Sequence, residues 1–600
     1  MNKKFIIVAL ASALMLSGCT GKTTDNTKSP GSQPNETLSY ITIKDSDTDT
    51  SYDASSYTVE YSGNSVTCSS PDVTISGTIL TITKSGTYVI SGDSDDGQII
   101  VNTDDNSKVH LVFNNISLTC KNSAPLYVKN ADKVIITLAD GTENYMSDGE
   151  QFIYDDEESS DPNAVIFSKD DLSINGNGTL TVYAGLNNGI SCSDDLKIVG
   201  GSINVTAINT AIRGKDSLTV QDAVITASSD DNALKATNQD DASKGYIHII
   251  SGTLNITAKD DGLHAETDIK IDGGTLTFDC EDDAIHSNGN ITIDNGSISI
   301  NAGDDGIHAD DYLVVNNGSI SVNKSYEGLE GNVITINDGT INITSSDDGL
   351  NASGESSSDN PMAADDSCII YINGGTLYVN ADGDGLDSNG SIVMENGVVA
   401  IDGPSTNANG ALDCGSTITV NGGYLFAVGS SGMAESISSS SSQNSALICL
   451  DSAVNGGLIT ITDDDDNVIL SFNAAKNFNA INISCPELEL ESTYNVYSGG
   501  TISDGKTLMT NFIINGTLND GTNLTTYTQS QVSVSNGRTG FGPGGGNDFK
   551  HNNDNFMPDG SDKNRPEKPD KSDNNPSDMP DNSDGMRPDM PDKPDSDSSL

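Results

Sequence analysis

The sequence predicts an all-β protein, a right-handed parallel β-helix with three short strands in each coil of about 22 residues and β-rich caps at its ends. The first observation behind this prediction is a small residue followed by an aliphatic one, as in Gly262-Leu263 and Ala284-Ile285, which recurs at a basal spacing of 22 residues. The second is the alternation of polar and aliphatic residues in short runs between Asn, Gly and Asp corners. A fixed period of this kind is typical of solenoids, and the alternation is typical of strands.

The repeat excludes two other architectures. The spacing i, i+3, i+4 of an amphipathic helix is missing from the runs. An antiparallel sandwich would also place strands about every 8 to 12 residues, but its strands would not repeat as whole coils. We therefore expect aliphatic residues to stack inward, with Ile269 and Ile271 next to Ile291 and Ile293, in coils about 4.8 Å apart.

Residues 1–19 are interpreted as a lipoprotein signal peptide. Lys3 and Lys4 precede the apolar stretch Phe5 to Leu16, and Leu16-Ser17-Gly18-Cys19 resembles a bacterial lipobox. The alternative is an ordinary secretory signal with a chance cysteine. We expect lipidation at Cys19 and an extracytoplasmic, lipid-anchored protein at the cell surface, with no other contact with the membrane.

Five further segments follow along the chain. Residues 20–56 are expected to form a flexible tether, 57–163 irregular N-terminal β coils, 164–430 the regular β-helix repeats and 431–535 a C-terminal β cap. Residues 536–600 are rich in Gly, Asp and Pro, and they are predicted to be a disordered tail, because such a composition buries little apolar surface.

Charge and cysteine content exclude several classes. The formal net charge of −58 disfavours nucleic-acid partners, because the phosphate backbone would be repelled. Beyond Cys19, eight widely spaced cysteines show no Cys-x-x-Cys spacing, so we expect most of them to be buried free thiols, with the existence of disulfides left open.

An acidic pair precedes most of the aligned small residues. Stacking would bring these carboxylates about 4.8 Å apart, where like charges repel by about 1 kcal/mol per pair even in water. An oxygen-rich corner suits Ca²⁺, so the sequence predicts several calcium ions, the alternative being solvated Asp side chains at turns. The predicted metal ligands are Asp260, Asp261, Asp282, Asp283, Asp304, Asp305, Glu327, Asp347, Asp348, Asp382 and Asp384.

A second column of polar residues lies two places after the small residue of each repeat. Their side chains should point outward as an exposed polar stripe, because side chains alternate along a strand. We interpret it as a ligand-binding groove. Two alternatives remain: stacked histidines that bind a transition metal, or surface histidines without a role. The candidate ligand-binding residues are His264, His286, His308, Glu330, Arg213 and Lys235.

These motifs carry a resemblance to a known family. The coils Asp260-Asp261-Gly262-Leu263-His264-Ala265, Asp304-Asp305-Gly306-Ile307-His308-Ala309 and Asp347-Asp348-Gly349-Leu350-Asn351-Ala352 resemble those of bacterial cell-surface carbohydrate-binding β-helix proteins. The resemblance covers roughly residues 57–535. It implies a shape similar to pectate lyases, bound calcium, and association with cellulose and pectin-type polysaccharides of plant cell walls. The acids are replaced at Asn187-Asn188, Asn209-Thr210 and Asn409-Gly410, which puts calcium there in doubt.

The sequence therefore predicts a surface-anchored, monomeric protein that binds plant-cell-wall polysaccharide through calcium, polygalacturonate or pectin first and cellulose second, without turnover. The lack of Trp and the 5% aromatic content leave little for a flat stacking platform. One alternative is a calcium-dependent adhesin or structural surface protein. Another is a pectate-type lyase, whose base is usually Arg or Lys: Arg213 is the only Arg before Arg538, and Lys235 follows it one coil on.

Overall fold

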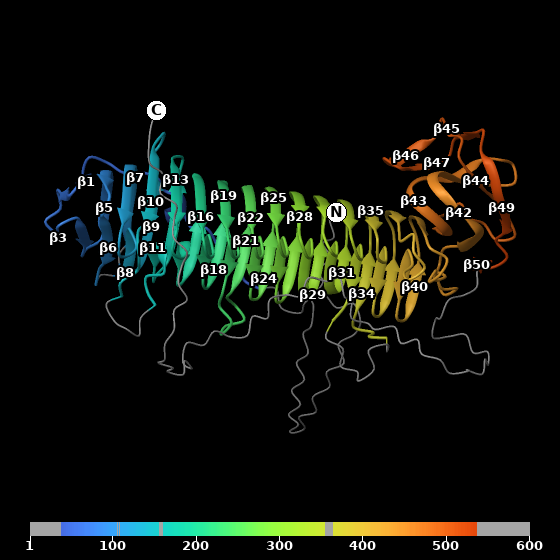
Figure 1. Cartoon of the computed structure of the whole chain (residues 1–600), viewed down its shortest axis with the longest axis horizontal. Helices are drawn as coiled ribbons and strands as arrows, with labels where there is room; N and C mark the ends of the chain where they lie inside the picture. The colour runs from blue at the N-terminus through green and yellow to red at the C-terminus, as the bar shows by residue number, and fades with distance from the viewer. Residues whose placement is uncertain (1–37, 105, 107, 155–159, 355–363, 537–600) are drawn as a thin grey trace, which may run out of the picture. The chain divides into compact units, whose positions relative to one another are not determined.

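The structure is a computed structural model that describes residues 38–104, 106, 108–154, 160–354 and 364–536 (Figure 1). The predicted signal peptide with Cys19, and residues 537–600 of the predicted tail 536–600, lie outside the described residues. The chain divides into two units, 1–553 and 554–600, and every described residue belongs to the first. No helix among the described residues is long and apolar enough to span a bilayer.

Each coil contributes one strand to each of three parallel sheets, which we call faces 1, 2 and 3. A strand of one face pairs with the strands of the same face in the coils before and after it (Figure 1). Face 1 contains β9 (Lys133–Leu138), β12 (Leu172–Gly176), β15 (Asp195–Ile198), β18 (Ser217–Val220), β21 (Tyr246–Ile249), β24 (Asp268–Ile271), β27 (Asn290–Ile293), the second halves of β29 (Ile307–Val315) and β31 (Leu329–Ile336), β34 (Ile369–Ile372), β37 (Ser391–Met394) and β40 (Thr417–Val420).

Face 2 contains β10 (Glu143–Asp148), β13 (Thr179–Ala184), β16 (Ser202–Ala207), β19 (Ala223–Ser229), β22 (Gly252–Ala258), β25 (Thr275–Cys280), β28 (Ser297–Asn301), β30 (Ser319–Lys324), β32 (Thr340–Ser345), β35 (Thr376–Ala381), β38 (Val398–Asp402) and β41 (Tyr424–Gly429).

Face 3 contains β4 (Ile79–Ile82), β6 (Gln98–Asn102), β8 (Leu126–Asn130), β11 (Ala164–Ser168), β14 (Asn188–Cys192), β17 (Ile212–Gly214), β20 (Leu234–Ala236), β23 (Leu263–Ala265), β26 (Ile285–Ser287), the first halves of β29 and β31, β33 (Leu350–Ala352), β36 (Leu386–Ser388) and β39 (Leu412–Cys414).

The first coils include antiparallel pairs. They are built from β1 (Tyr57–Ser62), β2 (Ser65–Cys68), β3 (Val73–Ser76), β5 (Gly86–Ser94) and β7 (Lys108–Cys120). β1 pairs with β2 and β3 pairs with β4 in antiparallel fashion, while β1, β5 and β7 pair in parallel.

A β-rich layer follows the last coil. It contains β42 (Ser445–Thr462), β43 (Val468–Ser484), β44 (Thr493–Ser498), β45 (Thr501–Ser503), β46 (Lys506–Met509), β47 (Phe512–Ile514), β48 (Thr517–Asn519), β49 (Thr522–Thr528) and β50 (Ser533–Ser535). β43 pairs antiparallel with β41, the last strand of face 2, and with β42.

The all-β, parallel β-helical fold predicted from the sequence is confirmed by these registers. Ile269 lies opposite Ile291, and Ile271 opposite Ile293, with all four side chains buried as an inward ladder. Burial of each such side chain contributes about 1.5–3 kcal/mol relative to exposure. The eight cysteines among the described residues are free thiols, as expected for most of them.

The small residue of the repeat lies where the coil turns from face 2 to face 3. A Cβ atom added to Gly349 would lie 2.2 Å from Val379 Cγ1 and 2.5 Å from the carbonyl oxygen of Gly385. Neither contact is compatible with ordinary packing, so the close approach of successive coils explains why this position is small in the repeat.

Residues 38–49 differ from the flexible tether that we expected, because they pack along face 1 and include helix α1 (Asp45–Thr48). The Tyr40 ring contacts Tyr246 edge-on, with 5.1 Å between ring centroids, and the Ile41 N–H donates to the Tyr246 hydroxyl (2.8 Å). The buried Asp47 carboxylate forms ion pairs with Lys133 and Lys197, the second at 3.3 Å. We call residues 38–49 the strap.

Candidate functional site

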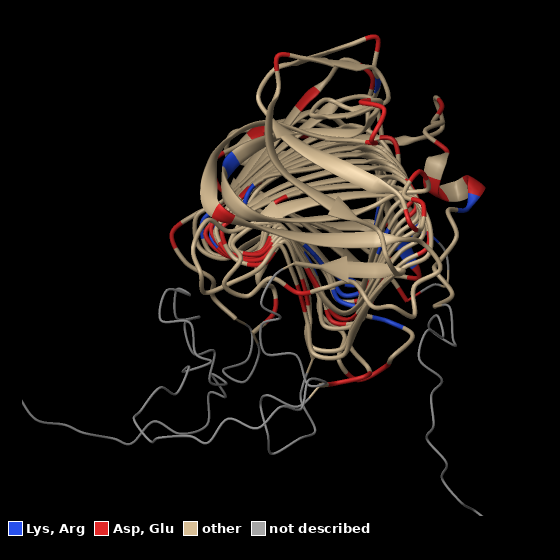
Figure 2. Cartoon of the chain, turned by 90° about the vertical axis from the view of Figure 1, so that its right-hand side faces the viewer, with Lys and Arg blue, Asp and Glu red and all other residues tan. Residues whose placement is uncertain are grey.

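The acidic pairs lie at the corner between faces 2 and 3, where successive coils bond to each other through their main chains. The Gly262 N–H donates to the carbonyl oxygen of Asp283 (3.0 Å), and the Ala284 N–H donates to that of Asp305 (3.1 Å). The view along the stack shows acidic positions gathered at the edges of the coils (Figure 2). The repeat therefore brings the predicted acids into columns, as the coil spacing implies.

The second acid of most pairs is buried rather than solvated, and Asp348 is half-buried. Asp283 and Asp305 are fully buried, because each carboxylate turns along the stack toward the main chain of the next coil. Asp283 Oδ1 accepts the Asp305 N–H (2.8 Å), and Asp348 Oδ1 accepts the Asp384 N–H (2.6 Å). These acids therefore also have a structural role, which the sequence did not reveal.

The first acid of each pair is mostly half-buried, and one predicted ligand lies apart from the columns. Asp260, Asp282 and Asp347 are half-buried, whereas Asp304 is buried. Asp382 is exposed and forms an ion pair with Lys476 from β43, 3.2 Å away. The structure therefore does not bring Asp382 to the other predicted ligands.

The second column stacks in register along face 3. Arg213, Lys235, His264, His286, His308, Glu330, Asn351, Asp387 and Asp413 lie opposite one another in successive coils. The exposed stripe that we expected is corrected, because Glu330 is buried and the three histidine side chains are only 12–16% exposed. The buried acids of the corner cover them.

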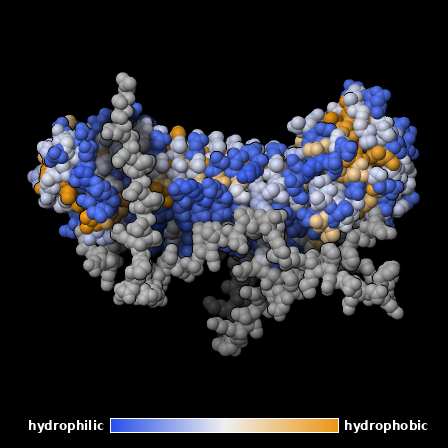
Figure 3. All heavy atoms as spheres, viewed as in Figure 1, coloured by the Kyte–Doolittle hydropathy of each residue, from blue (hydrophilic) through white to orange (hydrophobic). Residues whose placement is uncertain are grey.

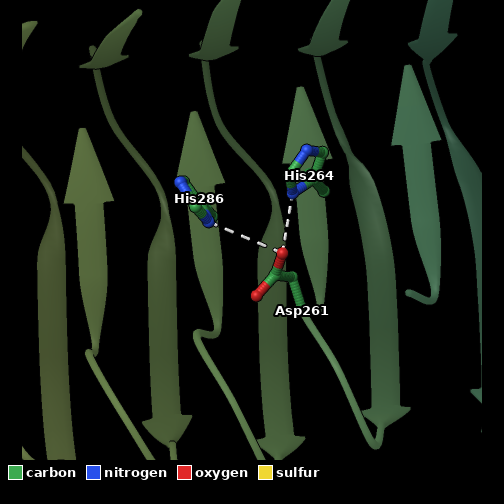
Figure 4. Close-up of side chains that lie close together, drawn as sticks. All are labelled: Asp261, His264 and His286. Carbon is green, nitrogen blue, oxygen red and sulfur yellow. Dashed lines mark hydrogen bonds and ion pairs between the residues drawn. The ribbon is translucent and has the colours of Figure 1, made fainter. Parts of the chain in front are cut away.

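The three histidines face the buried acids. His264 Nδ1 lies 2.7 Å from Asp261 Oδ2, while His286 Nδ1 lies 3.6 Å from the same oxygen (Figure 4). The next acid, Asp283, has its Oδ2 3.3 Å from His286 Nδ1 and 3.4 Å from His308 Nδ1. Among the groups that offer metal-ligand atoms within 4.8 Å of one another, three combine these histidines with acids: Asp261 with His264 and His286, Asp283 with His286 and His308, and Asp305 with His308 and Glu330.

We call this column of histidines and the acids that face it the histidine ladder. Along it, burial and neighbouring charges shift the pKa values in different directions. Burial opposes ionisation of Asp261, but hydrogen bonds from His264 and His286 hold its pKa well below the usual range. Burial and then the charge of Asp283 hold the pKa of Asp305 well above the usual range. Burial disfavours the charged form of His308, but its contact with Asp283 raises the pKa of the imidazole overall.

A carboxylate-only group occupies the same corner in the last coils. Burial, followed by the charges of neighbouring carboxylates, raises the pKa of Asp348 to about 8, of Asp384 to about 9 and of Asp387 to about 7. Burial and the charge of Asp413 likewise raise the pKa of Glu435 to about 7. We call these five residues the carboxylate group.

Three members of the carboxylate group were not assigned to metal binding from the sequence: Asp387, Asp413 and Glu435. A signal existed for the first, because Asp387 follows Asp384 by three residues just as His264 follows Asp261. Glu435 lies beyond the last regular coil, and no repeat points to it.

Another acidic group lies at the corner between faces 3 and 1. Asp171, Asp194 and Asp195 offer oxygens within 4.8 Å of one another. Burial and contacts with Asp216 and Asp171 raise the pKa of Asp194 to about 7. The sequence analysis missed this group, although an acid recurs just before several strands of face 1.

The positively charged candidates lie at the other end of the column from the carboxylate group. The Arg213 guanidinium donates from Nε and Nη2 to the Thr237 hydroxyl, at 3.2 and 3.0 Å. Lys235 lies opposite both Arg213 and His264 and is half-buried. The structure therefore separates these two cations from the carboxylate group.

Four matches to the profile of one protein family, described as carbohydrate-binding domain-containing protein, cover residues 76–283, 262–306, 279–362 and 304–482. Together they span more than half of the chain. This chain belongs to that family. The regular coils, the histidine ladder and the carboxylate group of this carbohydrate-binding domain-containing protein all lie within the matched residues.

One relative is a carbohydrate-binding domain-containing protein of Acetivibrio thermocellus, 40% identical over 182 residues, which are 30% of this chain. The match spans 64% of that relative's length, less than two thirds. A solved structure, described as a gadolinium derivative of the polysaccharide lyase-like protein from C. thermocellum, is 35% identical with a TM-score of 0.39 and covers 40% of this chain and 96% of its own.

Proposed function

We propose that this carbohydrate-binding domain-containing protein binds an acidic glycan through Ca²⁺ held by the carboxylate group. The observation that carries the proposal is a set of buried and half-buried carboxyls whose charged neighbours are carboxylates. The charges that shift the pKa of Asp348, Asp384 and Asp387 all come from other acids. A hard cation would relieve this repulsion, and Ca²⁺ accepts six to eight oxygen ligands with tolerant geometry.

The surface supports recognition by charge rather than by stacking. Among the described residues from 225 to 432, none is a large hydrophobic side chain that is exposed. The view in Figure 3 shows hydrophilic residues over the middle coils. Because the net charge is −58, an acidic polysaccharide would be repelled unless bound cations bridge the two sets of carboxylates.

We further propose that the glycan is of the polygalacturonate type found in plant cell walls, with cellulose as the neutral alternative, and that the protein is held at the cell surface by lipidation of Cys19. The motifs of the acidic corner and the lipobox-like Leu16-Ser17-Gly18-Cys19 support these parts of the proposal.

Retention on immobilised polygalacturonate should require Ca²⁺ and should be lost when EGTA is added. Replacing Asp384 by Asn should weaken retention by about tenfold or more, because one charge of the carboxylate group is removed while its size is kept. The matched control is Asp338→Asn, an exposed acid at another corner, which should bind like the wild type. Wild-type retention that persists undiminished in EGTA, or retention of Asp384→Asn equal to that of the wild type in Ca²⁺, would exclude the proposal.

We expect no lyase turnover. Arg213 is separated from Asp387 by seven steps of the face 3 register, roughly 34 Å at about 4.8 Å per coil, so it cannot act on a sugar bound at the carboxylate group. Wild type incubated with polygalacturonate and Ca²⁺ at alkaline pH should form no unsaturated product detectable in the ultraviolet. Product that disappears in Arg213→Ala would show that the protein is a lyase.

A further inference from the structure

We propose that Asp283, His286 and His308 form a site for a borderline divalent metal ion such as Zn²⁺. This site is separate from the proposed Ca²⁺ site and does not depend on it. Its ligand atoms would be Asp283 Oδ2 and the Nδ1 atoms of the two imidazoles. The three residues offer ligand atoms that lie within 4.8 Å of one another.

The two distances from the Asp283 carboxylate to the histidines fit a tetrahedral ion better than direct hydrogen bonds. Zinc lies about 2.0–2.1 Å from nitrogen and about 2.0–2.2 Å from carboxylate oxygen, so two ligands at a tetrahedral angle are about 3.3–3.4 Å apart. Asp283 Oδ2 lies 3.3 Å from His286 Nδ1 and 3.4 Å from His308 Nδ1. A hydrogen bond between such groups would be about 2.7–2.9 Å long.

The Asp283 carboxylate provides a second, independent observation. Its side chain is fully buried, and its Oδ1 already accepts the Asp305 N–H. Its Oδ2 has no hydrogen-bond partner and is directed at the two imidazoles, and His308 Nδ1 is likewise buried without a hydrogen bond. Leaving such buried polar atoms unsatisfied is costly, and a shared metal ion would satisfy both of them.

In the neighbouring coil of the histidine ladder, the corresponding acid and histidine form a direct hydrogen bond. His264 Nδ1 lies 2.7 Å from Asp261 Oδ2, a hydrogen bond that occupies both atoms. In contrast, the His286 and His308 rings are stacked on each other, with centroids 4.7 Å apart and planes 7° apart, and neither Nδ1 approaches Asp283 Oδ2 more closely than 3.3 Å.

Carboxylates on the far side of the rings fit the same assignment. Asp310 Oδ1 lies 3.6 Å from His308 Nε2 and 3.9 Å from His286 Nε2, and Glu330 Oε2 lies 3.7 Å from His308 Nε2. Carboxylates facing this nitrogen favour a proton on Nε2, which leaves Nδ1 available as the metal ligand. Imidazole nitrogen suits Zn²⁺, Cu²⁺ or Ni²⁺ and not Ca²⁺, which prefers oxygen.

The test is titration of the full chain, freed of metal by EDTA and dialysis, with Zn²⁺ in the presence of millimolar Ca²⁺. We expect the wild type to bind Zn²⁺ at least about tenfold more tightly than His308→Ala or Asp283→Asn. His110→Ala, which changes a histidine that contacts Thr137 on face 1, should bind like the wild type. Circular dichroism would establish that each variant is folded.

Cobalt provides a readout that does not depend on any variant. Co²⁺ added to the wild type should give the visible absorption bands of a tetrahedral site, and Zn²⁺ should remove them while Ca²⁺ does not. Equal Zn²⁺ affinity of the wild type and folded His308→Ala, absence of the cobalt bands, or displacement of Zn²⁺ by Ca²⁺ would each overturn the proposal.

Discussion

Replacing Asp47 by Ala should lower the free energy of unfolding by about 3–5 kcal/mol, because it leaves the buried ammonium groups of Lys133 and Lys197 without their counter-charge. The Asp47 side chain is fully buried, and it also accepts a hydrogen bond from the Ser173 hydroxyl (3.1 Å). Chemical denaturation of the wild type and the variant measures the difference.

The matched control is Asp45→Ala, in the same helix but exposed, which should change stability by about 0.5 kcal/mol or less. Acid should reproduce the loss in the wild type. Burial opposes ionisation, but the hydrogen bond from Lys133 lowers the pKa of Asp47 to about 2, so its contribution is present above about pH 4 and lost as pH falls toward 2. Equal stability of the two variants would show that the strap is not held by Asp47.

In the absence of divalent cations, the melting temperature should fall as pH rises from about 4 to about 9, and Ca²⁺ should remove most of that fall. Asp387, Asp348 and Asp384 have pKa values raised to about 7, 8 and 9, chiefly by burial. The same groups titrate near 3.9 in the unfolded chain, so the folded state retains protons that the unfolded state has released, and stability decreases as pH rises. Ca²⁺ bound at the proposed site would displace these protons and contribute about 2.7 kcal/mol at 100 times its Kd.

Calorimetry of metal-free protein at about pH 5, 7 and 9, with and without millimolar Ca²⁺, measures this effect. Asp384→Asn should flatten the pH dependence, because the carboxyl with the highest of these pKa values is removed, whereas Asp338→Asn should leave it unchanged. A metal-free melting temperature that is constant or rises over this interval would contradict the prediction.

The coil repeat could be predicted because it depends on neighbouring coils alone. The 22-residue period places Ile269 beside Ile291 and His286 beside His308, and these pairings follow from a regular stack whatever the rest of the chain does. The burial of Asp283 could not be predicted in the same way, because it depends on whether the side chain turns outward or toward the main chain of the next coil.

The strap and the carboxylate group could not be predicted from the sequence for other reasons. Asp47 meets partners 86 and 150 residues away in sequence, and nothing in its local pattern indicates them. In the last coils, the spacings between Gly349, Gly385 and Ala411 grow to 36 and 26 residues, so the period that aligned the earlier acids weakens where Asp387 and Asp413 come together.

The antiparallel pairs at both ends of the parallel stack have a consequence for self-assembly. A strand of the last coil, β41, gives its outer edge to β43, and at the first coil β2 and β3 cover the outer edges of β1 and β4. Antiparallel and parallel ladders space their hydrogen bonds differently, so a coil from another molecule finds no matching template at these edges. The outermost strands of the first coil are only four residues long, which further limits edge-to-edge pairing. These antiparallel pairs therefore disfavour the addition of a further parallel coil from another molecule at β41, β1 and β4.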